Sequence, residues 1–249
     1  MDLSKALKIT NHLNYDKISA NGYSEKRNDL DDIIKDYSCS RQIKFDWKKI
    51  PYTRIDFINL ALKNFTNPAY LEIGTHKNEC FNQINANDKT GVDPIGFGEK
   101  VLKKTSDEFF SSYNNDKTYD VIFIDGLHTH EQVRKDAINS LKYLKKNGII
   151  FFHDMLPLSW MAECPERIQV TWNGDVWKAG YELNEANGLD FKVILADHGI
   201  GMLKKLENNY ILNTQYDQIN KLRYNDFLES KIDYIEAETA VNFIKNIKI

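Results

Sequence analysis

The sequence predicts an α/β protein built on a doubly wound, mostly parallel seven-stranded sheet with one antiparallel strand near its C-terminal edge. Short apolar segments at residues 70–74, 91–93, 120–125 and 149–152 alternate with segments of helical periodicity. This alternation is typical of a parallel sheet covered by helices on both faces and joined by right-handed crossovers. Within residues 191–204 two apolar segments flank a short loop with glycine, which predicts a hairpin and hence an antiparallel strand.

The composition is that of a globular protein with room for one α/β domain and additional segments. The chain has 249 residues, of which 42% are hydrophobic and 28% charged, and a net charge of −3. This charge gives no reason to expect nucleic acid or an anionic membrane as a partner. The sequence has no apolar run as long as a membrane span, and residues 1–5 do not open a signal peptide. Three widely separated cysteines fit a reducing compartment, so we expect a cytoplasmic protein.

A polar segment precedes the expected domain. Residues 1–50 are predicted to be a helical extension, with one amphipathic helix within residues 28–37. We expect the extension to cover the domain or to join two copies in a homodimer. Residues 54–65 have the spacing of a helix with a core face, and a second helix is expected over residues 75–84.

The remaining elements complete a ligand-binding domain over residues 51–207. A third strand is expected at residues 100–104, and a long helix with regular apolar spacing at residues 129–146. Residues 155–173 lack periodicity and carry several aromatic side chains, so we expect a mobile loop with a functional role. Residues 208–249 are predicted to form a helical tail.

Polar residues stand where the predicted strands end. Gly74 ends the first strand, where the chain can turn tightly and its backbone can approach a ligand. Asp93 ends the second strand about 20 residues later, the separation at which a β-α-β unit places a carboxylate on ribose hydroxyls. Asp125 and Asp154 follow two further strands. Because ligands bind at the carboxyl ends of such strands, these residues are expected to share one crevice.

Five segments in chain order carry a resemblance to a known family: Glu72-Ile73-Gly74, Asp93, Thr105-Ser106-Asp107-Glu108-Phe109-Phe110, Ile124-Asp125-Gly126-Leu127-His128 and Phe152-His153-Asp154. The series resembles the motifs of class I S-adenosylmethionine-dependent methyltransferases over about residues 65 to 205. More narrowly, it resembles a bacterial small-molecule branch that includes many enzymes encoded with sugar and surface-polysaccharide pathways. The resemblance implies a Rossmann-like methyltransferase fold with S-adenosylmethionine as cofactor.

The resemblance also implies which residues contact this cofactor: Glu72, Gly74, Thr75, Asp93, Ser106, Asp107 and Asp125. Asp93 would accept hydrogen bonds from both ribose hydroxyls. Ser106 and Asp107 would contact the adenine, although the same segment has the composition of an ordinary helix cap. The family's loop has further glycines where this sequence has His76 and Asn78. The loop is therefore expected to be wider, or to use side chains where the family uses bare backbone.

Methyl transfer to a hydroxyl requires removal of its proton, and His128 is the expected base, with Asp125 and Asp154 beside it. An alternative is a magnesium ion held by Asp125 and Asp154, with His128 or His153 as third ligand. Polar and aromatic residues that follow the fifth strand are expected to bind the acceptor: His153, Trp160, Trp172, Asn173 and Lys178.

The resemblance, together with these residues, implies an enzyme that methylates a hydroxyl of a small polar acceptor, such as a sugar or activated sugar of a surface-polysaccharide pathway. Nitrogen and phosphate-linked oxygen remain open as acceptors. A nicotinamide-dependent oxidoreductase is a second reading, disfavoured by the absent glycine triplet and by the final hairpin. A non-catalytic cofactor-binding subunit is the third hypothesis. The presence of Asp125, His128 and Asp154 at strand ends argues against it.

Overall fold

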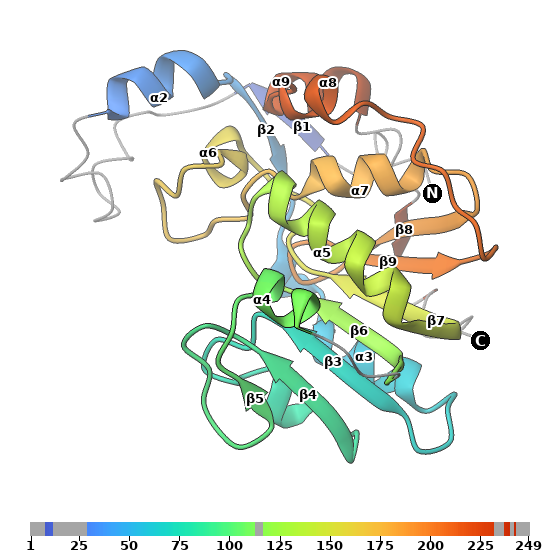
Figure 1. Ribbon diagram of the computed structural model, residues 1–249. Coiled ribbons are helices and arrows are strands. Elements are labelled where there is room, and N and C mark those ends of the chain that lie inside the picture. The colour runs from blue at the N-terminus through green and yellow to red at the C-terminus, as the bar shows by residue number, and fades with distance from the viewer. Residues whose placement is uncertain (1–7, 12–28, 113–116, 232–236, 240–241, 243–249) are drawn as a thin grey trace.

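The computed structural model describes residues 8–11, 29–112, 117–231, 237–239 and 242. Its centre is one sheet with the strand order β10-β8-β9-β7-β6-β3-β4-β5 (Figure 1). The strands are β3 (Ala69–Ile73), β4 (Asp88–Val92), β5 (Val101–Leu102), β6 (Tyr119–Ile124), β7 (Leu144–Phe152), β8 (Leu189–Leu195), β9 (Ile200–Lys205) and β10 (Ala237–Thr239). Strand β9 alone runs antiparallel to its neighbours within this sheet. The seven strands predicted from the sequence are confirmed, and β10 is an additional edge strand that the predicted helical tail did not include.

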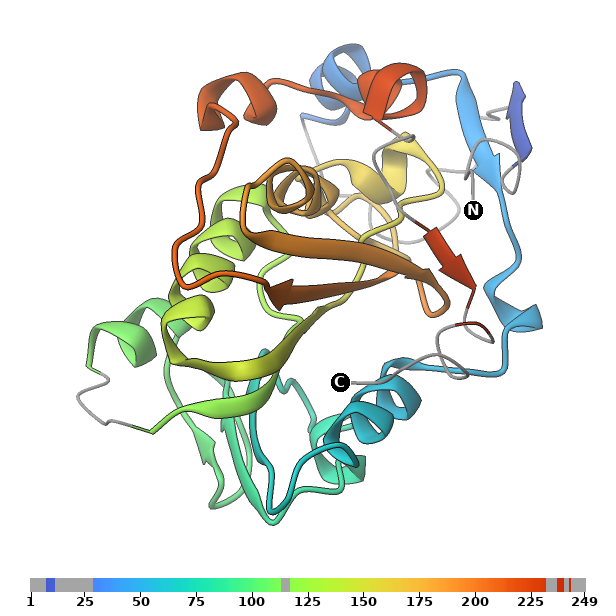
Figure 2. The same ribbon diagram turned by 90° about the vertical axis from the view of Figure 1, so that its right-hand side faces the viewer.

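Helices cover both faces of the sheet (Figure 2). They are α3 (Arg54–Leu62), α4 (Ser106–Ser111), α5 (His130–Tyr143), α6 (Trp160–Glu163) and α7 (Trp177–Asn184). Helices α5 and α7 pack on one face, in a cluster with Leu71 and Ile73, while α3 packs on the other, in a cluster with Tyr70. Successive strand residues point to opposite faces, so β3 contributes to both clusters. The sheet is thus fixed from both sides, which leaves its carboxyl edge for the site.

Segments at the two ends of the chain meet beside the domain. The N-terminal part contains β1 (Lys8–Asn11), α2 (Leu30–Tyr37), β2 (Arg41–Lys44) and a short 3₁₀ helix η3 (Trp47–Lys49); the C-terminal part contains α8 (Tyr216–Asn220), α9 (Tyr224–Asp226) and a π-helical turn η5 (Phe227–Lys231). Arg41 of β2 donates hydrogen bonds to Asn225 and Glu229. The helix predicted within residues 28–37 is confirmed as α2, and the antiparallel β1–β2 pair beside it was not predicted.

The helix predicted over residues 75–84 is wrong. The structure has turns there, followed by the 3₁₀ helix η4 (Phe81–Gln83). His76 and Asn78 have φ values of +47° and +64°, which a right-handed helix cannot contain. The segment is therefore a loop that lies across the carboxyl ends of β3 and β4.

No helix of the described ranges is long and apolar enough to cross a lipid bilayer.

A buried acid in α6 makes the stability of the fold depend on pH. Glu163 is fully buried and accepts a hydrogen bond from Trp177 Nε1 at 3.1 Å. Burial raises the pKa of Glu163 to about 7, against the opposing charge of Lys178. Between the ordinary pKa of a glutamate and pH 7 the folded protein holds a proton that the unfolded chain has lost. The free energy of unfolding should therefore fall as the pH rises through this window, by up to about 3 kcal/mol for this group.

Glu163→Gln should remove this part of the pH dependence, because the amide keeps an oxygen for Trp177 but does not titrate. Urea unfolding of both proteins at pH 5 and pH 8 measures the difference. Any fixed cost of the amide is the same at both pH values and cancels. An equal loss of stability from pH 5 to pH 8 in both proteins would show that Glu163 is not responsible.

Candidate active site

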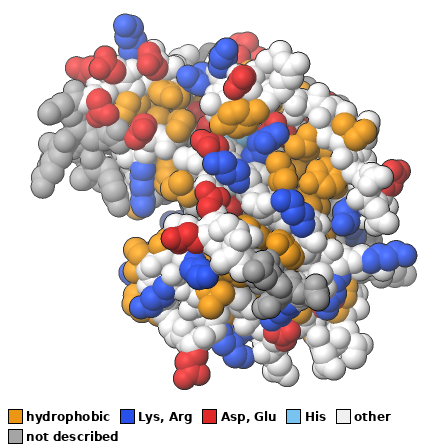
Figure 3. Space-filling view, viewed as in Figure 1, with side chains coloured by type: hydrophobic (Ala, Val, Ile, Leu, Met, Phe, Trp, Pro, Cys, Tyr) orange, Lys and Arg blue, Asp and Glu red, His pale blue; other side chains and the backbone are white. Residues whose placement is uncertain are grey.

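One pocket of about 930 Å³ opens at the carboxyl ends of β3, β4, β6 and β7. In the space-filling view the molecule is indented between the region of α6 and that of β4 and β5 (Figure 3). Eleven of the residues singled out from the sequence line this pocket: Glu72, Gly74, Thr75, Asp93, Ser106, Asp107, Asp125, His128, His153, Asp154 and Trp172. The structure thus brings both halves of the predicted site together.

Gly74 allows the loops after β3 and β6 to touch. Its φ of +87° lies in the region that favours glycine, and a Cβ atom there would overlap the backbone carbonyl of Asp125. The Gly74 N–H donates to Val92 O at 2.8 Å. This position therefore requires glycine for two separate reasons, and it fixes the floor of the pocket.

Asp93 anchors the loop that follows β3. Its Oδ2 accepts from the His76 N–H and its Oδ1 from the Ile95 N–H, both at 2.8 Å. Asn78 adds a bond from its side-chain amide to Phe97 O at 2.7 Å. The loop after β3 therefore does not need further glycines at these positions, because His76 and Asn78 themselves adopt positive φ values. A carboxylate has about four acceptor positions, so Asp93 keeps capacity for a ligand.

Glu72 is fully buried at the base of the pocket. Its Oε2 accepts a hydrogen bond from the Tyr70 hydroxyl. Within the described residues its Oε1 has no hydrogen bond of ordinary geometry, and the nearby Cys80 thiol is only a weak donor. Burial raises the pKa of Glu72 to about 7, although the bond from Tyr70 acts in the opposite direction. A buried carboxyl oxygen without a strong donor fits a site where a ligand supplies one.

The start of α4 forms another wall. Thr105 and Glu108 make the helix cap, so Ser106 and Asp107 are not used for capping. Gln132 of α5, which the sequence analysis missed, donates from Nε2 to Ser106 Oγ at 3.0 Å and to Asp107 Oδ1 at 3.1 Å. The two predicted adenine contacts are thereby held in place at the pocket wall.

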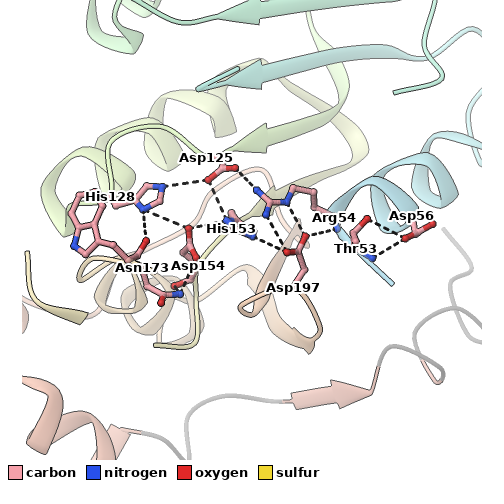
Figure 4. A network of polar contacts seen from close by, with 10 residues as sticks. Thr53, Arg54, Asp56, Asp125, His128, His153, Asp154, Asn173 and Asp197 are labelled. Atoms are coloured by element: carbon pink, nitrogen blue, oxygen red, sulfur yellow. Dashed lines mark hydrogen bonds and ion pairs between the residues drawn. The ribbon is translucent and has the colours of Figure 1, made fainter. Parts of the chain in front are cut away.

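Asp125, His128 and Asp154 lie together at the ends of β6 and β7 (Figure 4). His128 Nε2 is 3.4 Å from Asp125 Oδ1, and its Nδ1 is 3.5 Å from Asp154 Oδ2. Nδ1 also donates to Trp172 O at 3.1 Å, and the imidazole stacks on the Trp172 ring with centroids 5.0 Å apart. Asn173 donates from Nδ2 to Asp154 Oδ1 at 2.9 Å. Residues 172 and 173 thus orient two members of the cluster.

The same three residues satisfy a first requirement of a metal site. One ligand atom from each of Asp125, His128 and Asp154 lies within 4.8 Å of the others. Two carboxylates and an imidazole are ligands that divalent cations accept. The bonds that Trp172 and Asn173 make to His128 and Asp154 are of the kind that orients metal ligands.

Charges in the cluster stabilise one another. Burial alone would raise the pKa of Asp125, but His153, His128 and Arg54 hold it well below its usual range. Burial would lower the pKa of His153, and Asp154 and Asp125 outweigh it and raise that pKa well above its usual value. The pKa of His128 is also raised, because the bond to Asp125 and the charge of Asp154 exceed the effect of burial. These shifts favour the ionised form of Asp125 and the protonated form of His153.

Two further residues of the site, besides Gln132, were missed in the sequence. Arg54 of α3 contacts Asp125 and Asp197, and all three line the pocket. Asp197 lies in the loop between β8 and β9, where it could be interpreted only as a turn residue. Arg54 is 71 positions from Asp125 and 143 positions from Asp197 in the chain, so no local sequence pattern indicates these contacts.

Three of the five residues predicted to bind the acceptor do not line the pocket. Trp160 is fully buried in the hydrophobic core. Lys178 is 1% exposed and donates to Asp175 Oδ2 at 2.9 Å. Asn173 acts on Asp154 rather than facing the pocket. The loop expected over residues 155–173 is anchored by such buried residues, and its exposed part is limited to positions around Arg167 and Val170.

Comparison with known proteins concerns the same part of the chain. Residues 60–155 match the family model described as a methyltransferase domain. No curated protein matches the chain significantly.

Among solved structures, the SAH-bound methyltransferase PaMTH1 of Podospora anserina has 13% sequence identity and a TM-score of 0.49, and the match covers 66% of this chain and 83% of that one. A protein of Corynebacterium glutamicum has 13% identity and a TM-score of 0.47, with 65% and 86% covered.

Proposed function

We propose that this protein is an S-adenosylmethionine-dependent O-methyltransferase acting on a hydroxyl of a small polar acceptor, such as a sugar or activated sugar. The observation that carries the proposal is one pocket with two different halves. One half holds Glu72, Gly74 and Asp93, and the other holds Asp125, His128 and Asp154. The methyltransferase domain match over residues 60–155 supports this assignment.

The first half has the chemistry that the cofactor needs. S-adenosylmethionine supplies an electrophilic methyl group on a sulfonium. Asp93 would accept from the ribose hydroxyls, and the buried Glu72 Oε1 would accept from the ammonium group of the methionine part. Ser106 and Asp107, held by Gln132, would face the adenine.

His128 is proposed to take the proton of the acceptor hydroxyl. In the neutral imidazole Nδ1–H is bound to Trp172 O, so the lone pair belongs to Nε2, and Nε2 can donate to Asp125 only after it has taken the proton. Asp125 Oδ1, 3.4 Å from Nε2, and Asp154 would stabilise the imidazolium that forms. The Trp172 ring beside His128 provides a flat surface against which a sugar ring could pack.

A divalent cation is the second mechanism that the geometry supports. Asp125, His128 and Asp154 would hold it, and it would lower the pKa of a hydroxyl bound to it. The two mechanisms exclude each other in detail, since His128 cannot be both ligand and base through one nitrogen.

The class of reaction can be tested before the acceptor is known. In a thermal-shift experiment S-adenosylmethionine and S-adenosylhomocysteine should raise the melting temperature, and NAD should not. Transfer of labelled methyl groups to uridine diphosphate glucose, thymidine diphosphate glucose and guanosine diphosphate mannose then tests the activated-sugar class. Stabilisation by NAD alone would favour the oxidoreductase.

Asp93→Ala should weaken binding of S-adenosylmethionine by about 1.5–3 kcal/mol, more than about tenfold in Kd, because a charge-assisted hydrogen bond to the ribose is lost. Calorimetric titration measures this Kd. Asp88→Ala is the matched control: Asp88 is at the other end of β4, exposed and paired with Lys117. Equal affinity in a folded Asp93 variant and in the control would remove Asp93 from the cofactor site.

A further inference from the structure

A network centred on Arg54 joins three separate parts of the chain at the pocket (Figure 4). Its guanidinium donates twice to Asp197, from Nε to Oδ2 at 2.8 Å and from Nη2 to Oδ1 at 3.1 Å. The third arm, Nη1, donates to Asp125 Oδ2 at 2.6 Å. Because two bonds to one carboxylate fix the plane of a guanidinium, Asp197 sets the direction in which Nη1 points.

The backbone around this pair is also fixed. Thr53 precedes α3, and its N–H and hydroxyl both donate to Asp56 Oδ2. The N–H of Arg54 donates to Asp197 Oδ2 at 2.9 Å, which satisfies an amide that the first turn of a helix leaves without an internal partner. Asp197 is therefore held by the helix backbone as well as by the guanidinium.

Asp125 consequently presents one defined oxygen to the reacting groups. Its Oδ2 is bound to Arg54, while Oδ1 lies 3.4 Å from His128 Nε2 and 3.3 Å from His153 Nδ1. The torsion angle χ2 of an aspartate has only a weak preference, so without the bond to Arg54 the carboxylate could rotate. The side chains of Arg54, Asp125 and Asp197 are only 24%, 16% and 14% exposed, so water competes weakly with these bonds.

We propose that Arg54 and Asp197 are positioning residues that orient Asp125 toward His128, an inference that rests on the proposed function. Both lie outside residues 60–155, the part that matches the methyltransferase family. Segments on either side of the matched part thus complete the site. Helix α3 supplies the guanidinium of Arg54, and the β8–β9 loop supplies the carboxylate of Asp197, which fixes the orientation of that guanidinium. An Arg54–Asp197 ion pair that served stability alone would not need the additional hydrogen bond from Arg54 Nη1 to Asp125.

Arg54→Lys and Asp197→Asn test the proposal by kinetics. Lysine keeps the charge, but a single ammonium cannot hold two carboxylates in one plane. With the sugar nucleotide that gives turnover, kcat should fall about 10- to 100-fold, because the reacting groups are misplaced. KM and the Kd of S-adenosylmethionine should stay within about twofold of wild type. Asp197→Asn should lower kcat in the same direction, and the double variant should add little, because the two residues act as one unit.

Arg41→Lys is the matched control, since Arg41 pairs with Glu229 at 2.8 Å away from the pocket lining and should keep its kcat. A crystal structure of Arg54→Lys gives a readout independent of turnover: Asp125 Oδ1 should no longer face His128 Nε2. If Arg54→Lys does not fold, Asp197→Asn carries the same comparisons.

Loss of thermal stability with unchanged kcat and unchanged orientation of Asp125 would make the network an ordinary structural ion pair and overturn the inference. A wild-type protein that neither binds S-adenosylmethionine nor transfers methyl groups would instead overturn the proposed function. The orientation of Asp125 in the variant crystal would still decide the role of Arg54.

Discussion

Replacing His128 by glutamine is expected to lower kcat by about 10²–10⁴-fold, the usual contribution of general acid–base catalysis. The Kd of S-adenosylmethionine should stay close to wild type, because His128 lies on the half of the pocket that we propose to bind the acceptor. Glutamine preserves the size of the side chain but cannot take a proton at neutral pH. Steady-state kinetics with a sugar nucleotide and calorimetry with the cofactor measure the two quantities separately.

His198→Gln is the control for this prediction. His198 lies near the site, with its ring centroid 6.0 Å from that of His153, but does not line the pocket. Its replacement should leave kcat unchanged. Full activity in His128→Gln would remove this residue from the mechanism.

Chelation separates the two proposed mechanisms. If EDTA abolishes turnover of the wild type and magnesium restores it, the cluster of Asp125, His128 and Asp154 acts as a metal site. If EDTA has no effect while His128→Gln is inactive, His128 is the base. The raised pKa of His128 leads to a further expectation. If His128 is the base, kcat/KM should fall as His128 becomes protonated, and this fall should occur at a pH above the ordinary pKa of histidine.

The sheet and the ends of its strands could be predicted because the signals are local. Buried strands are apolar along their length, and an acid within two residues of the last residue of β4, β6 and β7 marks their carboxyl ends. In a parallel sheet these ends meet at the same edge, so Asp93, Asp125 and Asp154 could be placed in one pocket without knowledge of any contact. The structure confirms that placement.

Contacts between distant segments could not be predicted in this way. Arg54 stands in an ordinary amphipathic helix, and Asp197 in a loop whose composition indicates only a turn. Trp160 shows the opposite failure: an aromatic side chain in an aperiodic segment has the same signature whether it faces a ligand or the core. Its burial follows from tertiary packing that the local sequence does not record.

Gly174 lies in the turn whose residue Trp172 orients His128, so a substitution at this glycine should have a large effect on kcat. Its φ is +67°, and a Cβ atom there would overlap the backbone carbonyl of His128. A backbone atom cannot move aside as a flexible side chain can. Gly174→Ala should therefore push the turn away from His128, with loss of the Trp172 contacts that hold the imidazole.

We expect Gly174→Ala to lower kcat by about 100-fold or more and to reduce the free energy of unfolding by about 2–4 kcal/mol, from overlap together with backbone strain. Gly98→Ala separates these two causes: Gly98 has a φ of +88°, yet a Cβ atom there would meet nothing within 4 Å. The control should lose about 1 kcal/mol or slightly more by strain alone and keep its activity. Urea unfolding and kcat are measured for both variants. Equal effects in the two would mean that the left-handed backbone, and not the close approach to His128, is what requires glycine at position 174.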